Sequence, residues 1–281
     1  TGEVRFVTPG DNALPVQEHG LREVFTALAG AFACTYVMLL VFCLLHRRNR
    51  SRLHKVLLTT VLLKFLVMLL IESDLESQSH TGRKSMTWQI FLELIRQVQK
   101  IMEVMMFYFI GLGWKVTRAH LRPSEQAFAA TISILSFILG SVEVSCRTFA
   151  PCSDESFLLT QFTLHSLCFL VVIIGTNFNI FTLQRQISDA LASPETGGLY
   201  LKHRAYCWFR GLFLYFIITP SVTKFLTVHI VHRDKLWAVN LVQELSLWFI
   251  YTALVLLFAP GPNHLKVFEL AVVDPSGESG N

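Results

Sequence analysis

The chain alternates between long apolar runs and short polar segments, and this alternation predicts its fold. A helix needs roughly 20 apolar residues to cross a hydrocarbon core of about 30 Å. Seven stretches meet or approach that length, and the mostly short connections between them predict antiparallel neighbours. The predicted spans are Val24–Leu45, Val56–Ile71, Ile90–Gly113, Phe128–Val144, Phe157–Phe181, Phe209–Val231 and Leu236–Ala259. The pattern therefore predicts an all-α membrane protein, a seven-transmembrane helix bundle.

The sequence around the spans divides the chain into three parts. Residues 1–20 are polar and contain two prolines, which is typical of a flexible lead. Residues 21–265 hold the predicted seven-transmembrane bundle. Residues 266–281 form a predicted cytosolic tail that ends in the polar segment DPSGESGN.

The composition agrees with a membrane environment. Hydrophobic residues make up 52% of the chain and charged residues 16%, whereas soluble domains carry about 25% charged residues. The formal net charge is only +4, and the basic residues lie in several connections instead of one long patch. This distribution argues against a nucleic-acid partner and makes the lipid bilayer the expected surroundings of the chain.

The distribution of basic residues also predicts the orientation, because short cytoplasmic loops carry the excess of Lys and Arg. The first, third and fifth connections are richer in Lys and Arg than the connections that alternate with them. The segment Glu72–Glu76, which follows the second span, is acidic. We therefore expect the N-terminus outside or in a lumen and the C-terminus in the cytosol.

The third predicted span is the least apolar of the seven. At about 100° per residue, its polar side chains fall within one arc of roughly 120°. They are Glu93, Arg96, Gln97, Lys100 and Glu103. Ionised groups at membrane depth usually face the protein interior, so we expect this stripe to point into the bundle. It either holds the fold through pairing with neighbouring helices or lines a functional cavity.

The depth of a charged residue in the membrane, counted in residues along its span, predicts which charged side chains form ion pairs. Lys64 lies close to the depth of Glu103 at about 1.5 Å per residue, which predicts an intramembrane ion pair between them. Other polar residues are expected to line an outward-facing pocket or to form a closed ion-pair network. These cavity and ligand-binding candidates are Arg96, Lys100, Glu143, Lys224, His229, Asn240, Gln243 and Glu244. A pocket with several cations suits an anion or a lipid head group.

Cysteine and histidine patterns limit the chemistry that is expected. Cys146 and Cys152 flank a short segment of the second predicted outer loop, where an oxidising lumen would favour a disulfide; two unpaired thiols are the alternative. The sequence contains no CxxC pair, no HExxH motif and no GxSxG elbow. It therefore points to no metal, no cofactor and no enzymatic activity.

The ends of two spans resemble those of a known membrane-protein family. The third span ends in GLGWKVTR, a Gly-Trp pair followed by a short basic segment. The seventh runs from Trp248 through apolar residues into the exit APGPNHL, and a basic segment with HKVLL opens the second span. These features resemble the membrane portion of the GOLD-domain seven-transmembrane (GOST) proteins, which include the lung seven-transmembrane receptor family.

The resemblance implies a location and a role without naming a ligand. It implies a receptor-like or protein-trafficking role in Golgi, endosomal or plasma membranes, with a cargo or cytosolic adaptor protein as partner. It also implies a lumen-facing cavity for a lipid or small ligand. GOST proteins usually carry a β-sandwich domain before the first span, and the roughly twenty residues here are too few for one. We therefore expect a fragment or a relative without that domain.

Two other functions remain open from the sequence. The polar face of the third span would also suit an ion channel or transporter. The bundle would equally suit a membrane anchor for a regulatory domain outside this chain, such as a ubiquitin ligase domain.

Overall fold

The regular elements in the described part of the chain are all helices. The computed structural model describes residues 21–47, 51–81, 85–118, 120–149, 154–189, 196–229 and 236–258. The helices are α1 (Leu21–Leu45), α2 (Arg52–Thr81), α3 (Met86–Gly111), α4 (Pro123–Phe149), α5 (Asp154–Asp189), α6 (Thr196–His229) and α7 (Leu236–Phe258). Six of them are long and apolar enough to cross a membrane, and the remaining one is α3. The predicted all-helical fold with seven helices is confirmed.

Several helices extend well past the apolar runs that revealed them. The apolar run of α2 ends at Ile71, but the helix continues to Thr81. Helices α5 and α6 contain 36 and 34 residues, more than the roughly 20 that a bilayer core requires. Hydrophobicity marks only the part of a helix that faces apolar surroundings, whereas the backbone hydrogen bonds continue into polar sequence.

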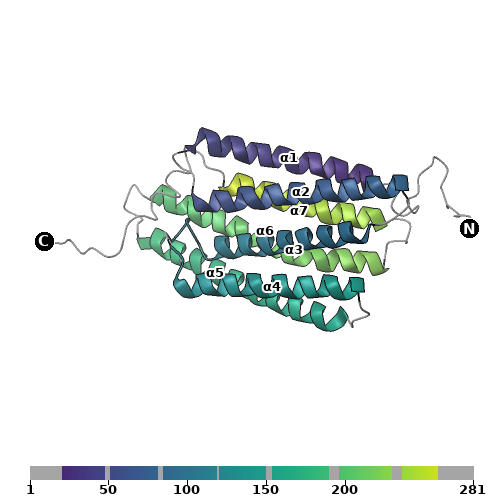
Figure 1. The fold of residues 1–281 in the computed structure, drawn as a ribbon. Helices are drawn as coiled ribbons and strands as arrows, with labels where there is room; N and C mark the ends of the chain where they lie inside the picture. The colour runs from purple at the N-terminus through teal and green to yellow at the C-terminus, as the bar shows by residue number, and fades with distance from the viewer. Residues whose placement is uncertain are drawn as a thin grey trace, which may run out of the picture.

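The helices lie side by side along one axis (Figure 1), and their contacts form a closed ring with one helix outside it. Neighbours follow the order α1, α2, α3, α5, α6 and α7, and α7 packs back on α1. Helix α4 packs on α3 and α5 from outside this ring. Helix α3 therefore has neighbours on three sides, and on its polar face Glu103 is buried, Glu93 and Arg96 are half-buried and Lys100 is exposed.

Apolar side chains occupy both the interior and the outer surface. The largest fully buried side chains are mostly aromatic, among them Tyr108, Tyr206 and Tyr251. Large apolar side chains are also exposed, and Phe162 and Phe181 have 68% and 66% of their surface accessible. Soluble monomers rarely expose wide apolar patches, so this outer belt is the surface expected of a protein surrounded by lipid.

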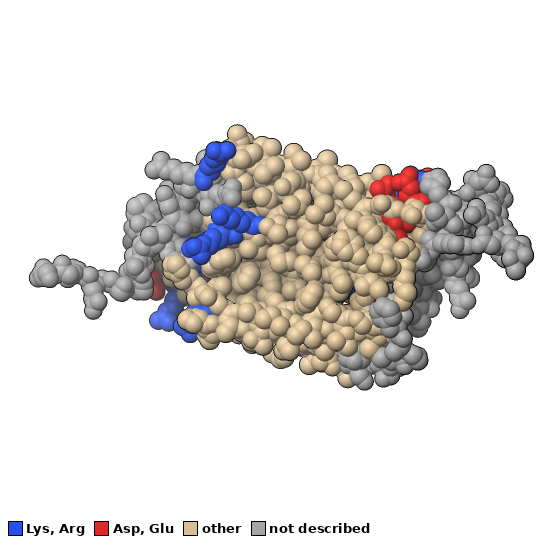
Figure 2. Space-filling model, viewed as in Figure 1, with Lys and Arg blue, Asp and Glu red and all other residues tan. Residues whose placement is uncertain are grey.

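Charged residues gather at the two ends of the bundle (Figure 2). We call the end that contains Leu21 the N-terminal end and the end that contains Phe258 the C-terminal end. In the view of Figure 2, Lys and Arg lie over the C-terminal end and a patch of Asp and Glu lies over the N-terminal end. The apolar middle between them matches the lipid-facing belt.

Candidate functional site

Helix α3 carries one polar face along about its first two thirds. The residues of this face lie three or four positions apart, as one side of a helix requires: Gln89, Glu93, Arg96, Lys100 and Glu103. The next residue on the same face is Phe107, which is buried. The face therefore changes from charged to aromatic between Glu103 and Phe107.

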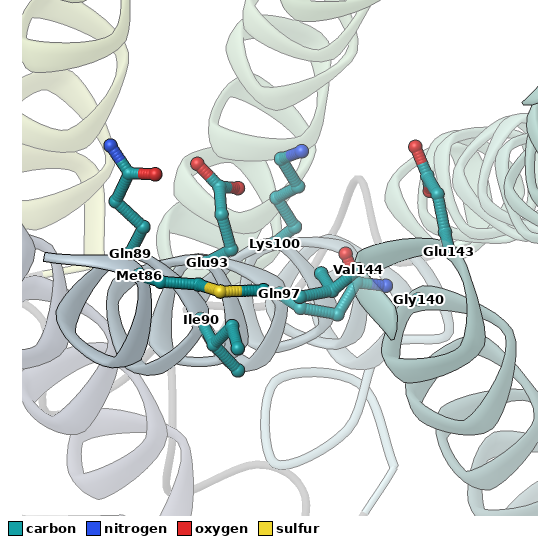
Figure 3. Close-up of a pocket in the computed structure, with 9 residues that line it drawn as sticks. All are labelled: Met86, Gln89, Ile90, Glu93, Gln97, Lys100, Gly140, Glu143 and Val144. Atoms are coloured by element: carbon teal, nitrogen blue, oxygen red, sulfur yellow. The ribbon is translucent and has the colours of Figure 1, made fainter. Parts of the chain in front are cut away.

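A first pocket of about 430 Å³ lies between α3 and α4 near the N-terminal end. Gly140 leaves room for the side chain of Gln97, since a Cβ at this position would lie 2.3 Å from Cδ of Gln97. Buried Gln97 in turn donates a hydrogen bond of 2.9 Å to the carbonyl oxygen of Ser136. Figure 3 shows four polar side chains of the pocket extending to the same side: Gln89, Glu93, Lys100 and Glu143. Met86, Ile90 and Val144 complete the lining.

A second pocket, of about 420 Å³, lies among α1, α2, α3 and α7. It shares Gln89 and Glu93 with the first pocket, so the two pockets flank the same half of α3. Arg96 lines the second pocket and forms an ion pair with Glu93. The other lining residues are Leu21, Phe25, Ile71, Asp74, Leu75, Gln78, Leu92 and Asn240.

A buried polar cluster joins α2, α3 and α7 deeper in the bundle. Nζ of Lys64 lies 2.8 Å from Oε2 of Glu244. The two groups are within ion-pair distance, although they are not aligned as a conventional hydrogen bond. The hydroxyl of Tyr251 donates a hydrogen bond of 2.7 Å to Oε1 of Glu103, and Gln99 donates to the same oxygen. These five residues, here called the buried polar cluster, connect three helices through side chains.

The partner of Lys64 differs from the predicted one. Depth counting predicted an ion pair between Lys64 and Glu103, whereas the ion-pair partner of Lys64 in the structure is Glu244. Glu103 instead accepts hydrogen bonds from Tyr251 and Gln99. Residue counting gives the height of a side chain in its helix but not the direction in which the packed helix turns it.

Aromatic side chains fill the bundle on the C-terminal side of this cluster. The ring of Phe107 lies 4.5 Å from that of Phe216 and 5.3 Å from that of Phe213, between centroids. Nearer the end of the bundle, Phe209 packs against Phe258 at 6.2 Å. These contacts between α3, α6 and α7 close the interior beyond the polar face of α3.

Four of the predicted cavity residues line the two pockets. Lys100 and Glu143 line the first, and Arg96 and Asn240 line the second. Gln243 is half-buried and lines neither of these two pockets. The sequence suggested one pocket, whereas these four residues line two pockets, on different sides of α3.

The remaining predicted site residues lie elsewhere or outside the described residues. Glu244 belongs to the buried polar cluster instead of an open pocket. The side chains of Lys224 and His229, and the whole of Cys152, lie outside the described residues. The disulfide between Cys146 and Cys152 therefore stays a prediction. Among the described residues, no group of three His, Cys, Asp or Glu side chains is placed to hold a metal ion.

Sequence reasoning missed three polar residues of the site, although helical spacing offered a signal for two. Gln89 lies four residues before Glu93 on the polar face of α3 and lines both pockets. Tyr251 lies seven residues after Glu244, two turns along the same side of α7. Gln99 lies beside the stripe, and its role follows only from its hydrogen bond to Glu103.

The turn that follows α3 is held by side chains of α5 and α6. Gly113 has a φ of +80°, a left-handed conformation that favours glycine. Nδ2 of Asn179 donates a hydrogen bond of 2.9 Å to the carbonyl oxygen of Gly111. The hydroxyl of Tyr206 donates one of 3.3 Å to the carbonyl oxygen of Ile110. The Gly-Trp segment noted in the sequence is thus a structured helix end that ties α3 to its neighbours.

Comparison with known families decides the relationship that these helix ends suggested. The seven-transmembrane domain of the GOST family matches residues 21–260, which include all seven helices. The chain belongs to the GOST family. A search of curated proteins found no match. As a GOST seven-transmembrane domain, the chain is a multi-pass membrane protein, and the resemblance seen in its helix ends is confirmed for the membrane portion.

Proposed function

We propose that this GOST chain is a receptor-like or protein-trafficking membrane protein that binds a lipid head group or small ligand, without catalysis of its own. The observation that carries the proposal is the pair of pockets beside α3, which share Gln89 and Glu93 and contain charges of both signs. The buried polar cluster and the aromatic side chains lie farther along the bundle. A ligand would therefore enter from the N-terminal end.

The charge distribution supports an outward-facing cavity. Exposed basic residues at the C-terminal end include Arg52 and Lys55 on α2 and Arg122 before α4. The acidic residues Glu72 and Glu76 lie toward the opposite end of α2. Because cytoplasmic segments carry the excess of Lys and Arg, we place the C-terminal end in the cytosol and the pockets outside or in a lumen of the Golgi, endosomes or cell surface.

The first pocket offers a cation that the fold itself does not use. Lys100 lines this pocket and is exposed, and within the described part of the chain it makes no ion pair. The nearby Arg96 is paired with Glu93. Oγ of Ser136, next to the carbonyl that Gln97 binds, is buried without a hydrogen-bond partner. Ser136 does not line the pocket, and the pocket also contains Glu93 and Glu143, so Lys100 alone favours a ligand with an anionic oxygen, such as a phosphate or carboxylate.

An ion channel or transporter is the second candidate function, and the length of the polar face on α3 favours it. This face reaches Glu103 inside the bundle. Beyond it, however, Phe107 packs on Phe213 and Phe216, so conduction requires these rings to separate. Ion flux through liposomes that contain the purified chain tests this candidate, and electrically silent vesicles would count against it.

Lipid retention tests the proposed cavity. Native mass spectrometry of the purified full chain would measure the phospholipid that remains bound. We expect Lys100→Glu to reduce bound lipid by about tenfold, the effect of one lost charge-assisted hydrogen bond. Lys55→Glu makes the same charge change at an exposed site at the other end and should leave retention unchanged. Equal retention in all three proteins would contradict the cavity.

A separate experiment tests the trafficking role. Quantitative surface proteomics would compare cells that lack this chain with cells that express the wild type or Lys100→Glu. We expect specific surface proteins to decrease without the chain and to return only with the wild type. A surface proteome that is the same in all three cell lines would contradict a role in trafficking.

A further inference from the structure

Three contacts define the level at which most of the bundle ends on the C-terminal side. Asn179 on α5 binds the carbonyl of Gly111, the last residue of α3. Tyr206 on α6 binds the carbonyl of Ile110 beside it. Phe209, one turn from Tyr206, packs on Phe258 at the end of α7. Asn179 and Tyr206 therefore mark the height at which α3 and the described part of α7 end.

Helices α5 and α6 continue past this level together. Helix α5 runs on to Asp189 and α6 begins at Thr196, so each projects about 15 Å at 1.5 Å per residue. Figure 1 shows both helices reaching farther toward the C-terminal end than α3 and α7. We call residues 180–189 and 196–205 the α5–α6 arm.

The lipid-facing side of α5 leads directly onto the arm. Exposed apolar residues follow one another at helical spacing on this side: Leu170, Ile174, Phe178 and Phe181, with 53%, 59%, 55% and 66% of their surface accessible. The next residue on the same side is Arg185, which is exposed. The apolar side of α5 thus ends in an arginine.

The corresponding side of α6 has the same order. Its exposed apolar residues are Val222, Ile218, Tyr215 and Trp208, with 47%, 54%, 43% and 61% of their surface accessible. The next residue on this side is Arg204, also exposed, and Tyr200 follows it. Since one side of a straight helix keeps its direction, the side that faces lipid in the bundle is the side that carries arginine in the arm.

A third exposed arginine lies between the two helices. Nη1 of Arg210 lies 3.5 Å from Oδ1 of Asn177 and donates to it. By helical rise, Arg210 lies about 6 Å inside the level of Tyr206, whereas Arg204 and Arg185 lie about 3 Å and 9 Å outside the level. The head-group layer is roughly 5–7 Å thick. Given the length of their side chains, all three guanidinium groups reach this layer.

We propose that the lateral face of the α5–α6 arm, together with Arg210 on the adjoining turns of α6, binds anionic phospholipid head groups through Arg185, Arg204 and Arg210. Guanidinium groups bind phosphate through paired hydrogen bonds. The only acidic residue in the described arm, Asp189, lies at its tip, beyond the three arginines. A lipid fits this face better than a soluble protein partner, because the face continues the lipid-facing surfaces of both helices.

Lipid titration of the purified full chain tests the proposal. Native mass spectrometry would compare phosphatidylserine with phosphatidylcholine for the wild type and for Arg185→Gln/Arg204→Gln/Arg210→Gln. At roughly fivefold per basic residue near a membrane surface, we expect the triple variant to lose at least tenfold of the preference for phosphatidylserine. The matched control Arg47→Gln/Arg52→Gln/Arg122→Gln removes three exposed charges at the same end, outside the arm, and should keep the preference.

Two results would overturn the arm as a lipid site. One is a wild-type chain that binds both lipids equally. The other is an equal loss in the arm variant and the control, which would mean that diffuse positive charge is sufficient. If the triple variant fails to fold, the single substitutions make the same comparison. The Lys100→Glu chain should keep its preference for phosphatidylserine, which separates this site from the proposed cavity.

Discussion

The ammonium group of Lys64 on α2 lies 2.8 Å from the carboxylate of Glu244 on α7. The Lys64 side chain is 4% exposed and that of Glu244 is 18% exposed, and the Lys64 ammonium also lies 5.9 Å from the centre of the Phe32 ring. This ion pair therefore joins two helices that are distant in the sequence, next to a third.

Removing one partner of this pair should cost more than removing both. We expect Lys64→Met to lower the free energy of unfolding by about 3–5 kcal/mol, because it leaves a buried carboxylate uncompensated. The double variant Lys64→Met/Glu244→Met should recover most of this loss, since apolar residues of similar size replace both charges. Thermal unfolding of the purified variants in detergent measures the effect. A double variant that is less stable than the single one would contradict this reasoning.

The hydroxyl of Tyr251 should matter more than an exposed tyrosine hydroxyl. Tyr251→Phe removes the 2.7 Å hydrogen bond to Glu103 and should destabilise the protein by about 1.5–3 kcal/mol, the range for hydrogen bonds to charged groups. Tyr215→Phe is the matched control, because it removes a 2.9 Å bond to the neutral Ser246 and should cost about 1 kcal/mol or less. Equal melting temperatures for the two variants would show that the hydrogen bond to Glu103 stabilises the protein no more than the hydrogen bond to Ser246.

Two glycine substitutions should change stability in opposite directions. Gly113→Ala puts a side chain at a φ of +80° and a Cβ 2.0 Å from Oγ1 of Thr117, so we expect a loss of at least about 1–2 kcal/mol. Gly30→Ala lies inside α1 with no atom within 4 Å of the new Cβ, and should stabilise the helix by up to about 1 kcal/mol. Melting temperatures of both variants provide the test. A Gly113→Ala variant with the melting temperature of the wild type would mean that the turn after α3 accommodates the new side chain without strain.

Cysteine labelling tests the orientation. Ser85 and His120 are exposed at opposite ends of the bundle. In sealed cells or vesicles of known sidedness, an impermeant maleimide should label Ser85→Cys from the outer or lumenal side. It should label His120→Cys only after permeabilisation, with the unsubstituted chain as the background. Labelling of both positions from one side would contradict the membrane-spanning arrangement, and the reverse pattern would invert the orientation.

The sequence was sufficient to predict the helices because each one contains an apolar run, which in six of the seven described helices is long and apolar enough to cross a membrane. It also predicted one polar face on α3 that points into the bundle; Gln97 and Glu103 on it are buried, whereas Lys100 is exposed. The helix ends were harder to predict. The acidic end of α2 around Glu76 is helical, and there Arg22 of α1 forms an ion pair of 2.7 Å with it. Such a contact depends on which helices are neighbours, which composition does not reveal.

The individual contacts of the site were beyond sequence reasoning for a related reason. The choice of Glu244 over Glu103 as the partner of Lys64 depends on the rotation of α7 about its axis. The division of these residues between two pockets depends on the position of α3, which lies between α4 on one side and α1, α2 and α7 on the other. These features come from the packing of the whole bundle, and no local pattern encodes them.

The charged face of α3 also affects how the protein is inserted into the membrane during synthesis. A translocating channel presents each new segment to lipid in turn, and a charged residue at the centre of a helix opposes insertion by about 2.5–3.5 kcal/mol. Helix α3 contains Arg96, Lys100 and Glu103 near its middle. We therefore expect α3 to enter the bilayer only after a neighbouring helix packs against this face. A nascent chain that stops before α4 should leave its third helix outside the bilayer.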